Sequence, residues 1–156
     1  MNKLDNIKSL LSEWLVGTIF ASINFAVGFT IRLERTETSD KKPNVLNLDI
    51  RSTARFGNEG EWKHFIDSLP FKTRRGEIDE PALAYRLMLL LGAMISEVEL
   101  KGDGSISIST TDGETFTVLG IEDVWEESWV LTEPRDVAGE QARSIICSSE
   151  GSVFVT

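Results

Sequence analysis

The chain has 156 residues, of which 41% are hydrophobic and 26% charged, a composition typical of one soluble globular domain that buries its own core. No apolar run reaches the roughly 18 residues that a transmembrane helix needs. The N-terminus lacks the continuous apolar stretch of a signal peptide, and one cysteine cannot form an internal disulfide. We therefore expect a single domain over residues 1–156, located in the cytoplasm.

The net charge of −9 is unevenly distributed along the chain. Residues 1–96 contain 13 Lys/Arg and 12 Asp/Glu, a net of +1, whereas residues 97–156 contain 3 and 13, a net of −10. Such an excess of negative charge repels phosphates, which argues against direct binding of nucleic acid. Two interpretations of the acidic half remain, a solubilising surface or a surface that steers a cationic protein.

The chain begins with a predicted amphipathic helix, which Asp5 can cap and Gly17 can end. Alternation of apolar residues then predicts strands in "TIFASINFAV", "FTIRLER" and "VLNLDI". Further on, "EGEWKHFIDSL" has apolar residues at helical spacing and predicts a short helix. The residues that mark the apolar face of the first helix, at spacings of three and four, are Ile7, Leu10, Leu11, Trp14 and Leu15.

The same order of elements recurs from residue 79. Asp79 can cap a second helix, Pro81 fits its first turn, and Gly92 can end it. Strands follow in "AMISEVELK", "SISIST" and "ETFTVLG", separated by the glycine turns "GDG" and "DG". A last hairpin is expected to turn at residues 149–151.

These two passages align at a constant offset of 75 residues, which pairs Gly17 with Gly92. We predict an α+β fold with a mostly antiparallel β-sheet, or two small sheets, on which the helices pack. The sheet is built from two similar helix-plus-β-meander halves. Half one covers residues 1–71 and half two residues 79–156, joined by an exposed linker at residues 72–78.

Alternation also predicts which side chains face outward in the second half. If the apolar residues of each strand point inward, Glu97 and Glu99 share the opposite face. The strands beside them add Ser105, Ser107, Ser109, Glu114 and Thr117 to that face. The sequence therefore predicts an open sheet face of hydroxyls and carboxylates.

The stretch "GIEDVWEESWVL", residues 120–131, holds the densest negative charge and two of the four tryptophans. Trp125 and Trp129 are open to two interpretations, packing in the core or anchoring an interface. Carboxylates on a rigid sheet can accept paired hydrogen bonds from arginines. The candidate partner-binding residues are Glu97, Glu99, Asp112, Glu114, Glu122, Asp123, Trp125, Glu126 and Glu127.

Residue types that carry catalysis are sparse. His64 is the single histidine, which excludes most multi-histidine metal sites, and Cys147 lies in an apolar strand, as an inert buried thiol does. No glycine-rich phosphate-binding motif is present. We expect no enzyme, no metal and no cofactor.

Several short motifs resemble a family of small, duplicated, β-rich immunity proteins found beside bacterial polymorphic toxins, including those of contact-dependent growth inhibition. The motifs are "LVG" at 15–17, "LLG" at 90–92, "TDGETFTV" and "ESW" at 127–129, while "RTETSDKKPN" replaces a tight DG turn in the first half. The resemblance implies a cytoplasmic protein that binds and neutralises one cognate toxin domain, often a basic nuclease. It implies no membrane contact, and a homo-oligomer is not predicted.

Four alternatives stay open at this point. Binding can instead use the first half, where Lys72, Arg74 and Arg75 would meet an acidic partner. The chain can be a regulatory or scaffold module, for example a homodimer joined through the sheet edge at residues 152–156. It can inhibit a host nuclease by the same surface. An enzyme would require an enclosed pocket containing His64 or Cys147.

Overall fold

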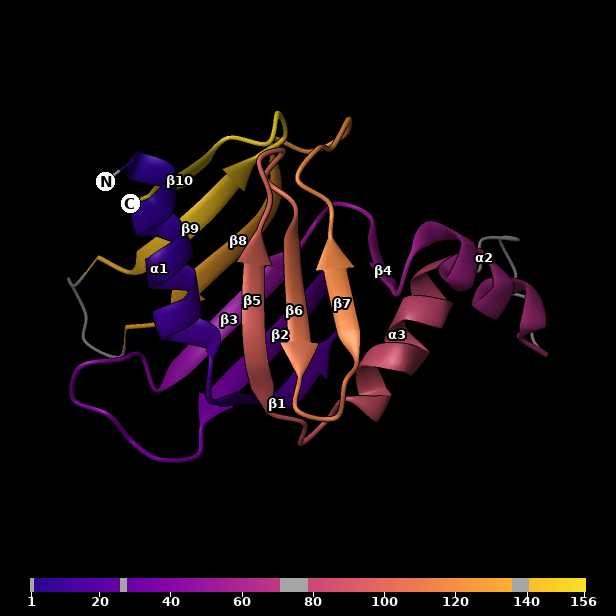
Figure 1. The fold of residues 1–156 in the computed structure, drawn as a ribbon, viewed down its shortest axis with the longest axis horizontal. Coiled ribbons are helices and arrows are strands. Elements are labelled where there is room, and N and C mark those ends of the chain that lie inside the picture. The colour runs from indigo at the N-terminus through magenta and orange to yellow at the C-terminus, as the bar shows by residue number, and fades with distance from the viewer. Residues whose placement is uncertain (1, 26–27, 71–78, 136–140) are drawn as a thin grey trace.

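The computed structural model describes residues 2–25, 28–70, 79–135 and 141–156. These residues form an α+β fold, as predicted, with helices packed against antiparallel sheets (Figure 1). The helices are α1 (Lys3–Leu15), α2 (Glu59–Ser68) and α3 (Asp79–Leu89). The strands are β1 (Thr18–Asn24), β2 (Phe29–Arg35), β3 (Val45–Ile50), β4 (Ala54–Phe56), β5 (Ile95–Leu100), β6 (Ile106–Thr110), β7 (Thr115–Val118), β8 (Glu127–Glu133), β9 (Arg143–Ser148) and β10 (Val153–Val155).

Each half of the chain contributes strands to both sheets. The six-stranded sheet has the order β1-β2-β3-β8-β9-β10, and the four-stranded sheet has the order β4-β7-β6-β5. The three-stranded meanders β1–β3 and β5–β7 thus lie in different sheets. After each meander the chain crosses over, so that β4 pairs with β7 and β8 pairs with β3. This exchange ties the two halves into one body.

The two aligned passages also meet each other directly. The Gly17 amide donates to the Ile95 carbonyl at 3.0 Å, and the Gly92 amide donates to the Phe20 carbonyl at 2.8 Å. Both glycines have φ +86°, a left-handed conformation that favours glycine, and both follow a helix. Positions 75 residues apart therefore occupy matching places about a local two-fold, which is the arrangement that a repeated unit would give. Duplication itself stays a prediction.

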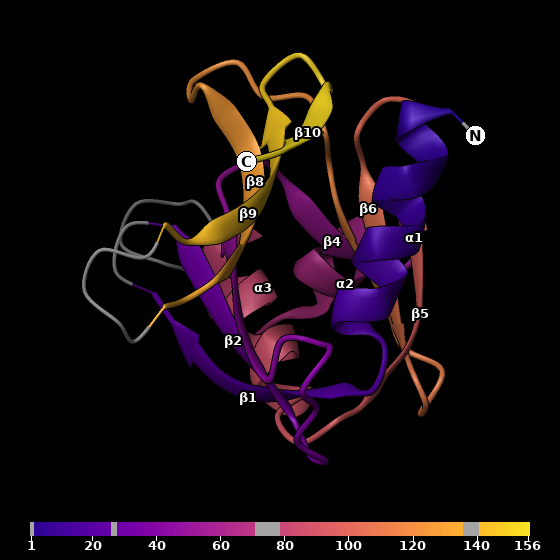
Figure 2. The same cartoon turned by 90° about the vertical axis from the view of Figure 1, so that its left-hand side faces the viewer.

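The core lies between the two sheets, which face each other in Figure 2. Inward-facing residues of both sheets belong to one buried cluster, and α1 closes one side of it while α2 and α3 close the other (Figure 1). Strand β3 shows the pattern most simply, since Leu46, Leu48 and Ile50 are buried and the residues between them are half-exposed.

The start of α1 differs from the prediction. Asn2, not Asp5, is the N-cap residue, and Asp5 lies in the first turn, where its carboxylate still favours the helix dipole. The end of α1 is held by Arg35 on β2, whose guanidinium donates to the carbonyls of Trp14 at 2.8 Å and Val16 at 3.0 Å. These carbonyls have no partner within the helix, so the arginine fixes α1 to the six-stranded sheet.

In the part of the chain described here, no helix is long and apolar enough to cross a membrane. The predicted linker, residues 72–78, lies outside the described residues. So do Lys72, Arg74 and Arg75, the basic residues of the alternative binding surface.

Candidate functional site

Residues 121–127, which follow β7 and end at the first residue of β8, form what we call the acidic loop. Three of its apolar side chains are exposed, with Ile121 at 59%, Val124 at 80% and Trp125 at 49% of their surface accessible. Single exposed apolar residues are common, but three in one segment form a patch. The same segment contains four carboxylates, Glu122, Asp123, Glu126 and Glu127.

The acidic loop is anchored at both ends to the turn between β9 and β10. The Glu122 amide donates to the Ser149 carbonyl at 3.0 Å, and the Ser149 amide donates to the Glu126 carbonyl at 2.9 Å. Within the loop, the Glu122 carboxylate accepts a hydrogen bond from the Val124 amide at 2.7 Å. Since these bonds fix the loop before any partner arrives, less conformational entropy is lost on binding.

Gly120, the residue just before the acidic loop, packs against backbone atoms with almost no free space. A Cβ on Gly120 would lie 2.2 Å from the carbonyl oxygen of Asp103, and a Cβ on Gly151 would meet the same oxygen at 2.2 Å. The β5–β6 turn is therefore wedged between the loop and the last hairpin. In this turn the Asp103 carboxylate accepts a hydrogen bond from the Ser105 amide at 2.9 Å, and hydrogen bonds from the Ser105 amide and side chain lower the pKa of Asp103.

Trp129, which the sequence left open, lies in the core. It is fully buried, and its indole Nε1 donates to the Gly104 carbonyl at 2.9 Å. Trp125 is not part of the core, because half of its surface is exposed at the loop. The two tryptophans of the acidic stretch thus have different roles, one packing the core under the loop and the other facing solvent.

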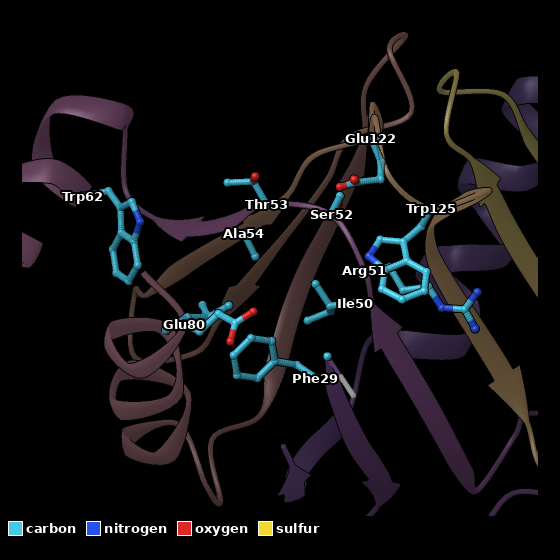
Figure 3. Close-up of a pocket in the computed structure, with 12 residues that line it drawn as sticks. Phe29, Ile50, Arg51, Ser52, Thr53, Ala54, Trp62, Glu80, Glu122 and Trp125 are labelled. Atoms are coloured by element: carbon cyan, nitrogen blue, oxygen red, sulfur yellow. The ribbon is translucent and has the colours of Figure 1, made fainter. Parts of the chain in front are cut away.

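Beside the acidic loop lies a cavity of about 600 Å³, which we call the crossover pocket because it opens where the chain passes from β3 to β4. Figure 3 shows Trp62 and Trp125 on opposite sides of it, with Phe29 between them. Pockets for small ligands have volumes of about 300–1,000 Å³. The lining residues are Gly28, Phe29, Ile50, Arg51, Ser52, Thr53, Ala54, Trp62, Glu80, Leu83, Glu122 and Trp125.

The charges of the crossover pocket are unbalanced. Among the described residues that line it, Arg51 is the one cation, and its guanidinium is turned away from the interior (Figure 3) and paired with Glu127 at 2.5 Å. The carboxylates of Glu80 and Glu122 extend into the pocket. Neither carboxylate forms an ion pair with any residue that the structure describes. Among the described residues, the pocket therefore combines carboxylates that have no ion-pair partner with apolar lining residues.

Two further candidate residues, Glu97 and Glu99, lie on the outer face of the four-stranded sheet. Glu97 pairs in register with Ser109, and Glu99 with Ser107. Across the next strand pair, Ser107 is hydrogen-bonded to Thr117 at 2.9 Å. The predicted face of hydroxyls and carboxylates is thus present, and a shallow hollow of about 410 Å³ lies over it. Arg55 on β4 lines the same hollow, and its Nε has no hydrogen-bond partner within the described structure.

The alternation argument was wrong for Ser105 and Glu114. Ser105 is 2% exposed and accepts a hydrogen bond from the Gly120 amide, because it lies in the wedged turn before β6 begins. Glu114 precedes β7, where the strand pattern no longer holds, and forms an ion pair with Arg86 of α3 at 2.7 Å. Asp112 is exposed in the β6–β7 turn, at the opposite end of β7 from the acidic loop (Figure 1).

The nine candidate residues therefore do not form one continuous surface. Five of them, Glu122, Asp123, Trp125, Glu126 and Glu127, come together in the acidic loop, while the others lie on the outer sheet face and at the far turn. The sequence reasoning missed the exposed apolar pair of Ile121 and Val124. Their position inside a charged stretch was the available signal, since a core strand would alternate.

His64 and Cys147 are the two residues that the sequence offered as candidates for catalysis. His64 is exposed on α2, and burial raises the pKa of the Cys147 thiol to about 11, an effect to which Asp103 adds. Neither residue lines the crossover pocket. Among the described residues, no group of three or more His, Cys, Asp and Glu side chains is arranged to hold a metal ion.

Comparison with known proteins gives no further assignment. No protein-family model, curated protein or solved structure was found to match this chain.

Proposed function

We propose that this chain is an immunity protein that binds a cognate toxin domain with a basic surface and neutralises it, with the acidic loop at the centre of the interface. The observation that carries this proposal is the exposure of Trp125 and Val124 in a short loop that also holds four carboxylates. Interfaces commonly combine an aromatic anchor with a charged rim that excludes water. The proposed place of action is the cytoplasm.

A nuclease is the toxin class that fits this chemistry best. Its active cleft is basic because it must hold phosphates, and residues 97–156 of this chain carry a net charge of −10. Opposite potentials raise the rate of association, and a well-packed centre slows dissociation. An inhibitor of a host nuclease would use the same surface, and the origin of the captured partner distinguishes the two.

A scaffold that self-associates is the second candidate. Strand β10 is an edge strand of the six-stranded sheet, and its residues Phe154 and Val155 are exposed. Unprotected edges of this kind can pair with a second copy. Sedimentation equilibrium distinguishes the candidates, because the scaffold would be dimeric without any partner.

The proposal is tested by protection of growth. The chain is used to capture its partner from the source cell, and the captured protein is identified by mass spectrometry and expressed in a bacterial host. We expect the captured protein to be basic and to stop growth, and co-expression of this chain to restore it.

The matched variant reverses the charge of Glu122, Asp123, Glu126 and Glu127 and should fail to protect at equal expression. A captured protein that is harmless to the host, or equal protection by the variant, would rule out the proposed function.

A further inference from the structure

We propose that the crossover pocket receives an arginine side chain of the partner, an inference that rests on the proposed function and specifies its contact. The pocket opens directly beside the acidic loop and shares Glu122 and Trp125 with it. A partner docked on the loop would therefore cover the mouth of the pocket. The group that fills the pocket therefore contributes to the affinity for the partner.

The shape and polarity of the pocket fit a long side chain with an apolar stem and a charged end. Its floor is apolar, formed by Phe29, Ile50 and Leu83, and such surface gains free energy when methylene groups cover it. The carboxylates of Glu80 and Glu122 enter it from different sides, Glu80 beside Phe29 and Glu122 near Ser52 (Figure 3). A neutral aliphatic side chain would leave these carboxylates desolvated without a partner, which costs free energy.

The aromatic side chain of Trp125, which forms one wall of the pocket, favours arginine over lysine. The indole of Trp125 presents a flat aromatic surface at the mouth, and a guanidinium can stack on it while it donates paired hydrogen bonds to a carboxylate. An ammonium group offers a point charge and no plane to stack. The chain's own Arg51 does not occupy this place, because it is held by Glu127 outside the interior.

The neighbouring polar hollow on the outer sheet face is a natural control. It also carries two carboxylates, Glu97 and Glu99, but it has no aromatic wall and includes Arg55 and Lys101. If negative charge alone were sufficient for binding, an arginine ligand would bind equally well to the crossover pocket and to the polar hollow. If the crossover pocket is the binding site, only substitution of its own carboxylates, Glu80 and Glu122, lowers the affinity for the ligand.

The test is a titration of the whole chain with N-acetyl-argininamide, followed by the indole N–H signal of Trp125 in proton–nitrogen correlation spectra. The uncharged N-acetyl-citrullinamide, which has nearly the same shape, is the comparison ligand. We expect saturable binding of the arginine compound with millimolar affinity, and binding of the citrulline compound at least about tenfold weaker. N-acetyl-lysinamide should lie between the two.

The variant E80Q with E122Q should weaken binding of the arginine compound at least about tenfold, whereas E97Q with E99Q should leave it unchanged. Glutamine at position 122 keeps the oxygen that accepts from the Val124 amide, so the loop should stay in place. Equal binding of arginine and citrulline, an equal loss in both variants, or no saturable shift would overturn the inference.

The two proposals can fail separately. If the arginine compound does not bind but charge reversal of the loop still abolishes partner binding, the pocket assignment is wrong and the proposed function stands. If the compound binds as expected but the captured partner is neutral or harmless, the proposed function is wrong and the pocket remains a guanidinium site.

Discussion

Replacing Gly120 by alanine should lower the free energy of unfolding by about 3 kcal/mol, the upper end of the cost of an added methyl group in a well-packed site. The new Cβ would lie 2.2 Å from the Asp103 carbonyl oxygen and 2.3 Å from the carbonyl carbon of Gly104. Both are backbone atoms of the wedged turn, so no side-chain rotation can relieve the overlap. For a chain of this size the midpoint of thermal unfolding should fall by about 6–12 °C.

Gly102 provides the matched control. It lies in the β5–β6 turn against which Gly120 packs, and a Cβ on Gly102 would meet nothing within 4 Å. The G102A variant should unfold within about 0.5 kcal/mol of the unchanged protein, measured by urea or thermal denaturation. Equal stability of the two variants would mean that the turn is not wedged at Gly120. The loop would then lack the rigid base that the proposed interface requires.

Charge reversal of Glu122, Asp123, Glu126 and Glu127 should weaken binding of the captured partner at least about 100-fold, or about 3 kcal/mol. Like charges placed against a basic surface repel, and the loss should be larger at low salt because screening is then weaker. Global folding should be preserved, because Asp123 and Glu126 are exposed and the hydrogen bond of the Glu122 carboxylate to the Val124 amide lies within the loop, so its loss affects the loop and not the core. The ion pair of Glu127 with Arg51 lies near the surface and contributes about 1 kcal/mol or less.

A second variant with the same change in net charge distinguishes contact from the overall field. Its four substitutions fall on exposed carboxylates of the first half, which lie outside the acidic loop, and it should lose far less affinity. The residues reversed in it are Asp5, Glu37, Asp40 and Asp67. Equal losses in calorimetry for both variants would show that the partner responds to net charge and makes no specific contact with the loop.

The elements that sequence reasoning found are those with strong local periodicity. The helices, both meanders and the last hairpin were predicted, since their apolar spacing and glycine turns are visible within short windows. Strands β4 and β8 were missed. β4 has only three residues, and β8 begins with the charged Glu127, so neither shows clear alternation. Their places depend on pairing with the opposite half, which no local pattern encodes.

The candidate site was predicted only in part, because the sequence reveals groups that are close along the chain and not those that the fold brings together. The carboxylates of the loop lie within six residues of one another in the sequence, so their proximity required no knowledge of the fold. The crossover pocket brings together Phe29, Glu80 and Trp125, which are far apart in the sequence. The difference between Trp125 and Trp129 was also beyond the sequence, because it is set by the Gly104 carbonyl that accepts from the buried indole.

The most direct measurement is the footprint of the captured partner on this chain, observed through the backbone amide and indole signals in correlation spectra. The largest changes should fall on residues 121–127, including the indole of Trp125, and on the lining of the crossover pocket. The β6–β7 turn around Asp112 should be unaffected. A footprint confined to the outer face around Glu97 and Glu99, or to the edge of β10, would contradict the acidic loop as the binding surface.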